Sequence, residues 1–62
     1  METQFHVGMK VIYNGNIQAF NGHEAKITAY SGQTEFAYIR PIVNGRLRQE
    51  FAVPLNELTA KN

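Results

Sequence analysis

The segment from Gly8 to Ala29 places the strongest constraint on how this chain can fold. Apolar and polar residues alternate from 7 to 14 and again from 23 to 30, and a period of two is typical of a half-buried β-strand. Between the two stretches lies a loop that starts near Gly15 and ends at Gly22. The pattern predicts two strands joined by a long glycine-bounded loop, which in a short chain favours a small, strongly bent β-barrel.

The second half of the chain continues the alternation. Residues 34 to 43 read as a third strand, although Pro41 cannot donate to a ladder and is expected at an edge, a bulge or a sharp bend. Asn44-Gly45 follows, and this dipeptide is a strong hairpin signal because both central residues of a type I′ turn need φ > 0. A fourth strand is expected over 46 to 53. A helical turn over Pro54 to Glu57 and a closing strand over Leu58 to Ala60 complete the predicted elements.

These elements predict an all-β fold, a small five-stranded SH3-like barrel with one helical turn before the last strand. Sixty-two residues without cysteine allow a single domain, 1–62, with no disulfide to support a core of this size. An OB-fold is the competing architecture. It needs a helix between its third and fourth strands, and Asn44-Gly45 leaves no room for one.

Composition limits the class of protein. Six Lys and Arg face five Glu, a net charge of +1, which does not indicate binding to nucleic acid through bulk charge. No apolar run approaches the roughly 18 residues of a membrane span, and the N-terminus has no signal-peptide pattern. We therefore expect a cytoplasmic protein that does not enter a membrane. Met1 and the run to Asn62 lead us to expect a complete small protein.

Catalytic and metal-binding patterns are absent from the sequence. His6 and His23 are the only imidazoles, there is no Asp or Cys, and no His and Glu residues have the spacing of metal ligands. Ser31 has no base near it in the sequence, and no glycine-rich phosphate loop precedes a helix. We expect a protein that is not an enzyme and that has no cofactor and no metal.

Aromatic residues are the first candidates for a binding surface. If Ala37 and Ile39 face inward, Phe36 and Tyr38 face outward with Arg40, and such a row could stack bases or hold a peptide. Tyr30, placed by parity on the outer face of the second strand, would extend the row. The alternative is that a register shift or the bend at Pro41 turns Phe36 or Tyr38 inward. Among the other rings, Phe51 is expected in the core with Phe20 folded over it.

Arginines around the predicted hairpin are the second candidates. Arg46 and Arg48 share one face of the fourth strand, and Arg40 lies across the Asn44-Gly45 turn. Guanidinium groups suit phosphate or carboxylate recognition. The alternative is a solvated hairpin that Glu35 and Glu50 partly neutralise.

The Gly8-to-Ile27 segment resembles a KOW motif, the motif of NusG-type elongation factors and certain ribosomal proteins. The resemblance rests on Gly8-x-Lys10-Val11-x-Tyr13, on Gly15, and on Phe20-Asn21-Gly22 before a strand that contains Ile27; it covers about a third of the 62 residues. It implies an SH3-like barrel in contact with RNA, ribosomal proteins or the transcription apparatus. The chain departs from the motif at His23-Glu24-Ala25, where a small or β-branched residue is usual. Lys26 is also the one basic residue on that strand, where RNA-binding members usually have several.

Two functions follow as hypotheses. The first is a non-enzymatic module that contacts RNA, DNA or a ribonucleoprotein or transcription complex through the surface formed by Tyr30, Phe36, Tyr38, Arg40, Arg46 and Arg48. The second is a protein–protein adaptor or inhibitor, such as a small viral or mobile-element protein, with no nucleic-acid contact; the near-neutral charge favours it. The short closing strand leaves an edge, so the chain is expected to be a monomer or a weak dimer.

Overall fold

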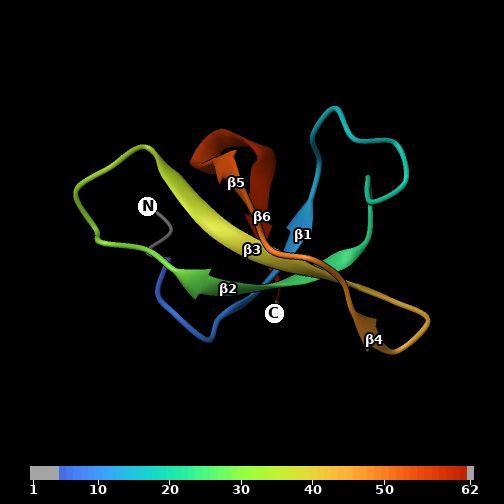
Figure 1. Cartoon of the computed structure of the whole chain (residues 1–62). Coiled ribbons are helices and arrows are strands. Elements are labelled where there is room, and N and C mark those ends of the chain that lie inside the picture. Colours follow the sequence, from blue (N-terminus) through green and yellow to red (C-terminus); the bar gives the residue numbers. More distant parts are fainter. Residues whose placement is uncertain (1–4, 62) are drawn as a thin grey trace.

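A computed structural model describes residues 5–61 and shows an all-β chain with one 3-10 turn before its last strand (Figure 1). The strands are β1 (Lys10–Tyr13), β2 (Glu24–Ala29), β3 (Phe36–Val43), β4 (Arg46–Leu47), β5 (Phe51–Pro54) and β6 (Leu58–Ala60). The turn, η1 (Leu55–Glu57), joins β5 to β6. The predicted all-β class and the helical turn before the last strand are confirmed. In this part of the chain no helix is long and apolar enough to cross a membrane.

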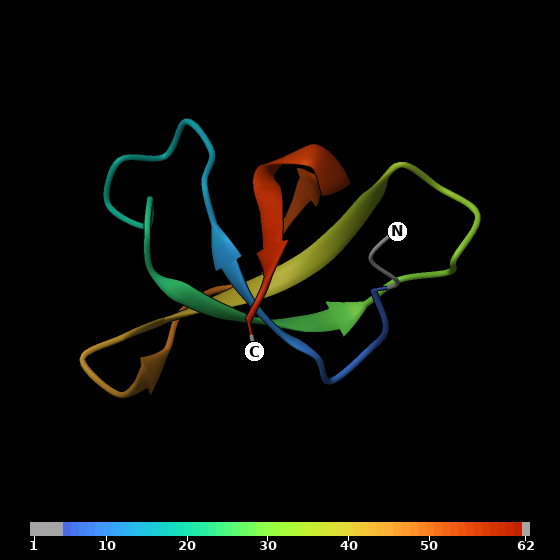
Figure 2. The same ribbon diagram turned by 180° about the vertical axis from the view of Figure 1, so that it is seen from behind.

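All six strands belong to one antiparallel sheet, in the order β4-β3-β2-β1-β6, with β5 also paired to β3. The sheet is strongly bent, and β1 and β6 run side by side across the β2–β3 pair (Figures 1 and 2). It does not close, because the ladders of the described strands join β5 only to β3 and β6 only to β1. β5 and β6 do not pair with each other, and η1 joins them across the gap between their edges. The fold is therefore an open, curved sheet and not the closed barrel expected from the sequence.

Six strands replace the expected five because the segment 46 to 53 leaves the ladder in its middle. β4 pairs with the end of β3 and β5 with its beginning, and residues 48 to 50 between them are outside both. Pro41 lies opposite this gap, where its carbonyl accepts a hydrogen bond of 2.7 Å from the Arg48 N–H. The N and the C=O of a strand residue face the same neighbour. The missing N–H of Pro41 therefore faces the interruption, and the proline removes no ladder bond.

A β-bulge between β2 and β3 reverses the predicted orientation of the side chains that follow it. The register runs through Ile27 opposite Ile39 and then skips to Ala29 opposite Tyr38, so that Thr28 is the extra residue. From Thr28 onward the two faces exchange. Ala29 is exposed, and Tyr30 is half-buried and packs against the core. Tyr30 therefore does not project fully from the outer face as expected, although its exposed part still lies beside Phe36 and Tyr38.

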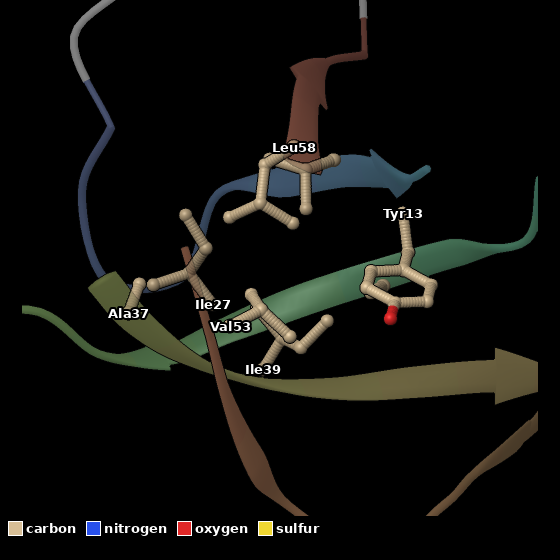
Figure 3. Close-up of a cluster of buried hydrophobic side chains, with 8 residues drawn as sticks. Tyr13, Ile27, Ala37, Ile39, Val53 and Leu58 are labelled. Carbon is tan, nitrogen blue, oxygen red and sulfur yellow. The ribbon is translucent and has the colours of Figure 1, made fainter. Parts of the chain in front are cut away.

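The core lies on the inner side of the curved sheet, where side chains from five strands point toward one another (Figure 3). Its buried members are Val11, Tyr13, Ala25, Ile27, Ala37, Ile39, Val53 and Leu58. Phe51 packs at its border, with the Tyr13 ring edge-on at 5.9 Å and the Phe20 ring stacked at 5.8 Å. The predicted packing of Phe20 over Phe51 is confirmed. This packing attaches the long loop to the core.

Hydrogen bonds fix the loop between β1 and β2. The Gly22 N–H donates to the Tyr13 carbonyl at 2.6 Å, and Asn21 Nδ2 donates to the Gly15 carbonyl at 2.7 Å. A Cβ atom at Gly15 would overlap the hydroxyl end of Tyr13 and the carboxylate of Glu57. The glycine at the start of the loop is therefore required by the close approach of two side chains.

The hairpin between β3 and β4 has the geometry expected of its sequence. Asn44 has φ 55° and Gly45 has φ 78°. Two successive positive φ values are the requirement of a type I′ turn.

Candidate functional site

Alternate side chains of β3 project from the outer face of the sheet. Ala37 and Ile39 are fully buried, whereas Phe36 is 44% and Tyr38 41% exposed. Arg40 continues the same face and is half-buried. Both aromatic rings therefore face outward as predicted, and the alternative in which one of them turns inward is excluded.

A groove lies at the Phe36 end of this face. The Phe36 and Tyr38 rings meet edge to face, with centroids 6.2 Å apart and planes at 76°. With the exposed part of Tyr30 they border a hollow of about 300 Å³, which we call the aromatic groove; its lining consists of Ala29, Tyr30, Ser31, Thr34, Phe36 and Tyr38. The lining is mostly apolar and includes the hydroxyl-bearing residues Ser31 and Thr34. The Gln33 N–H donates to Ser31 Oγ at 3.2 Å, and Thr34 Oγ1 donates to the Phe36 carbonyl at 3.0 Å.

Three cations form a line across the outer face beside the groove. Lys10 on β1 lies directly opposite Lys26 on β2, and Lys26 lies directly opposite Arg40 on β3. We call these three residues the cation row. Like charges placed directly opposite each other destabilise a sheet. The row therefore concentrates positive charge on the outer face of the sheet.

Only one end of the cation row has a carboxylate partner among residues 5–61. Glu24 lies 3.6 Å from Lys10 Nζ and accepts a 2.8 Å hydrogen bond from Lys61 Nζ. The Lys61 hydrogen bond, with the charges of both lysines, holds the pKa of Glu24 below its usual value. In the described residues no carboxylate forms an ion pair with Lys26 or Arg40. Positive charge is therefore least compensated at the Lys26–Arg40 end.

The Arg40 side chain is held in position by a backbone carbonyl of the segment between β4 and β5. Its Nε donates to the Arg48 carbonyl at 2.8 Å. A guanidinium has five N–H donors, so four terminal N–H groups remain for a ligand. Arg40 and Tyr38 are two residues apart on one strand, about 6.8 Å along it. The aromatic groove and the cation row are therefore continuous.

One negative charge lies at the junction of groove and row. Thr28, in the bulge, donates to the Tyr38 carbonyl at 3.3 Å and also contacts the Glu50 carboxylate. Glu50 comes from the segment that leaves the ladder between β4 and β5. A ligand crossing from the groove to Arg40 passes this carboxylate.

The hairpin arginines do not join the aromatic residues. The Arg48 guanidinium lies over the Phe20 ring, 5.9 Å from its centroid, and so faces the loop between β1 and β2. Arg46 lies next to the hairpin turn, opposite Val43 at the far end of β3 from Phe36; β4 is at that end of the sheet in Figure 1. From Phe36 to Val43 the strand spans about 24 Å, most of the 30 Å length of the molecule. The single surface predicted from the sequence therefore divides into two.

Four of the six predicted residues come together, namely Tyr30, Phe36, Tyr38 and Arg40. Sequence reasoning missed Lys10 and Lys26, although the alternation that places Arg40 outward also places both lysines outward. Their direct opposition depends on register, which no local pattern shows. A scan against protein-family models and searches of the curated proteins and of the solved structures found no match for this chain.

Proposed function

We propose that this protein is a non-enzymatic nucleic-acid-binding module whose contact surface is the outer face of β1, β2 and β3. The observation that carries the proposal is the cation row, in direct continuity with the aromatic groove. Cations bind phosphates, and exposed rings stack on bases. The KOW-like segment supports an SH3-like classification of the fold, and with it a ribonucleoprotein or transcription complex as the setting.

Local charge supports this function despite a net charge of only +1. Three cations lie on adjacent strands. In the part of the chain that the structure describes, Glu24 is shared between Lys10 and Lys61, and Glu50 lies at the junction of groove and row. A concentrated patch attracts an anion even when the whole chain is near neutral. Few phosphate contacts are available, so the binding depends only moderately on salt.

A protein partner is the second candidate, in line with an adaptor or inhibitor. Val7 is 56% and Leu47 48% exposed, and both border a hollow that also contains Lys26 and Arg40. Exposed apolar side chains gathered at one place mark interaction surfaces. The partner that fits this hollow is an acidic protein surface with apolar residues, and it would use the same cations.

Salt dependence of binding tests the first candidate. Fluorescence anisotropy of a labelled oligouridylate, measured between about 0.05 and 0.2 M salt, gives the association constant K at each salt concentration. A plot of log K against log salt concentration should have a slope of about −0.7 for each phosphate contact. Two or three contacts predict a slope between about −1.4 and −2.1. No binding of RNA or DNA at the lower salt concentration would contradict the proposal.

Two matched variants locate the surface. Lys26→Gln and Arg46→Gln each remove one positive charge, the first from the cation row and the second from the hairpin. We expect Lys26→Gln to weaken binding several-fold and to reduce the slope by about 0.7, and Arg46→Gln to have a clearly smaller effect. Equal losses would show that net charge, and not the cation row, determines the affinity.

A further inference from the structure

We propose that the aromatic groove holds one unpaired base, so that the module binds single-stranded and not duplex nucleic acid. This inference rests on the proposed function and specifies its ligand. Three observations carry it: the size and lining of the groove, the exposed ring pair, and the distance from the groove to Arg40.

The groove has the dimensions and the chemistry of a site for one small planar group. Its volume of about 300 Å³ is at the lower end of ligand sites. Phe36 and Tyr38 meet at 76°, so a planar group that stacks on one ring meets the edge or the face of the other. Ser31 Oγ accepts the Gln33 N–H, and its own hydrogen remains available to a polar base edge.

The neighbouring cations fix where the sugar–phosphate backbone would lie. Arg40 follows Tyr38 on the same face at about 6.8 Å, and Lys26 lies opposite Arg40. A nucleotide with its base in the aromatic groove therefore has Arg40 and Lys26 as the cations nearest its phosphates, beyond the Glu50 carboxylate at the junction. The Nε hydrogen bond to Arg48 holds Arg40 in position before the ligand arrives.

Duplex nucleic acid cannot use this arrangement. In a duplex the bases stack on each other and show only their edges in the grooves. Their faces are then closed to Phe36 and Tyr38, and only the cation row remains for the phosphates. A single strand exposes base faces and phosphates together, and sheets that bind it present aromatic rings next to basic side chains.

The test compares labelled oligouridylate, oligothymidylate and an RNA duplex of the same length, by anisotropy at one low salt concentration. We expect both single strands to bind more tightly than the duplex. Tyr38→Ala should weaken single-strand binding about fivefold or more, the effect of losing one stacked base, and leave duplex binding within a factor of two. Tyr38→Phe should retain single-strand binding, because the ring is kept.

Two further variants serve as controls. Lys26→Gln should weaken single-strand and duplex binding alike, since both use the phosphates. Ile17→Ala removes an exposed apolar side chain (41% exposed) from the loop between β1 and β2, and should change neither. If circular dichroism shows that Tyr38→Ala is unfolded, Phe36→Ala takes its place.

The outcomes separate the inference from the function on which it rests. Duplex binding as tight as single-strand binding, or an equal loss of both with Tyr38→Ala, would overturn the single-strand inference and leave nucleic-acid binding intact. Failure of all three probes to bind would overturn both. Binding of an acidic peptide that weakens with Lys26→Gln, without binding of any nucleic acid, would favour the protein partner.

Discussion

Replacing Lys26 by Gln should stabilise the fold and weaken nucleic-acid binding at the same time. Lys26 is the middle of the cation row and faces Lys10 on one side and Arg40 on the other. Replacing Lys26 by Gln removes its repulsion with Lys10 and with Arg40. The core is unchanged, because the Lys26 side chain is exposed. A residue that a fold retains at a cost in stability is best explained by a function.

The magnitude follows from the geometry of the two contacts. Two unit charges 4 Å apart in water repel by about 1 kcal/mol. Exposed side chains can move further apart, and Glu24 partly neutralises Lys10, so each contact costs about 0.2 to 0.5 kcal/mol. The sum of about 0.4 to 1 kcal/mol corresponds to a rise in Tm of about 2 to 8 °C for a domain of this size.

Thermal unfolding followed by circular dichroism, at about 0.05 M and at 1 M salt, measures this effect. The gain in Tm for Lys26→Gln should shrink at 1 M salt, where the Debye length falls to about 3 Å. Lys26→Arg is the control, since it keeps the charge and should keep the Tm. A lower Tm for Lys26→Gln, or a gain that does not depend on salt, would refute the repulsion.

Three more predictions concern the fold. Gly15→Ala forces a methyl group against Tyr13 and should lower the free energy of unfolding by about 1 to 3 kcal/mol, as measured by urea denaturation. Ile39→Val removes one fully buried methylene and should cost about 0.5 to 1.5 kcal/mol with an unchanged m-value. The folded-state pKa of Glu24 is lowered from 4.5 by its hydrogen bond from Lys61. The stability that this carboxylate contributes is therefore complete above pH 4.5 and is lost as the pH falls through the lower folded-state pKa. Glu24→Gln should remove that part of the acid dependence of the urea midpoint.

Local patterns in the sequence predict much of this fold. Alternation placed Ala37 and Ile39 on the face of the third strand opposite to Phe36 and Tyr38, and both are fully buried. The closing strand Leu58–Ala60 was predicted with its observed bounds. These features depend on short-range chemistry: the period of two, the φ requirements of the turn residues, and the inability of proline to donate.

Other features depend on contacts between distant residues, and the sequence did not predict them. The bulge at Thr28 contains no glycine or proline; its hydroxyl bonds to the Tyr38 carbonyl and contacts Glu50. The departure of residues 48 to 50 from the ladder divides the expected fourth strand and turns Arg48 toward Phe20. Both features changed the candidate site, because they rotate Tyr30 and separate the hairpin arginines from the aromatic residues.

An NMR titration of the isotope-labelled protein with oligouridylate tests the outer face most directly as the contact surface. The largest backbone shifts should lie on Lys10, Lys26, Phe36, Tyr38 and Arg40, and should decrease as the salt concentration rises. Shifts confined to η1, to the loop between β1 and β2 or to the hairpin, or no shifts at low salt, would contradict the assignment of this face to nucleic-acid binding.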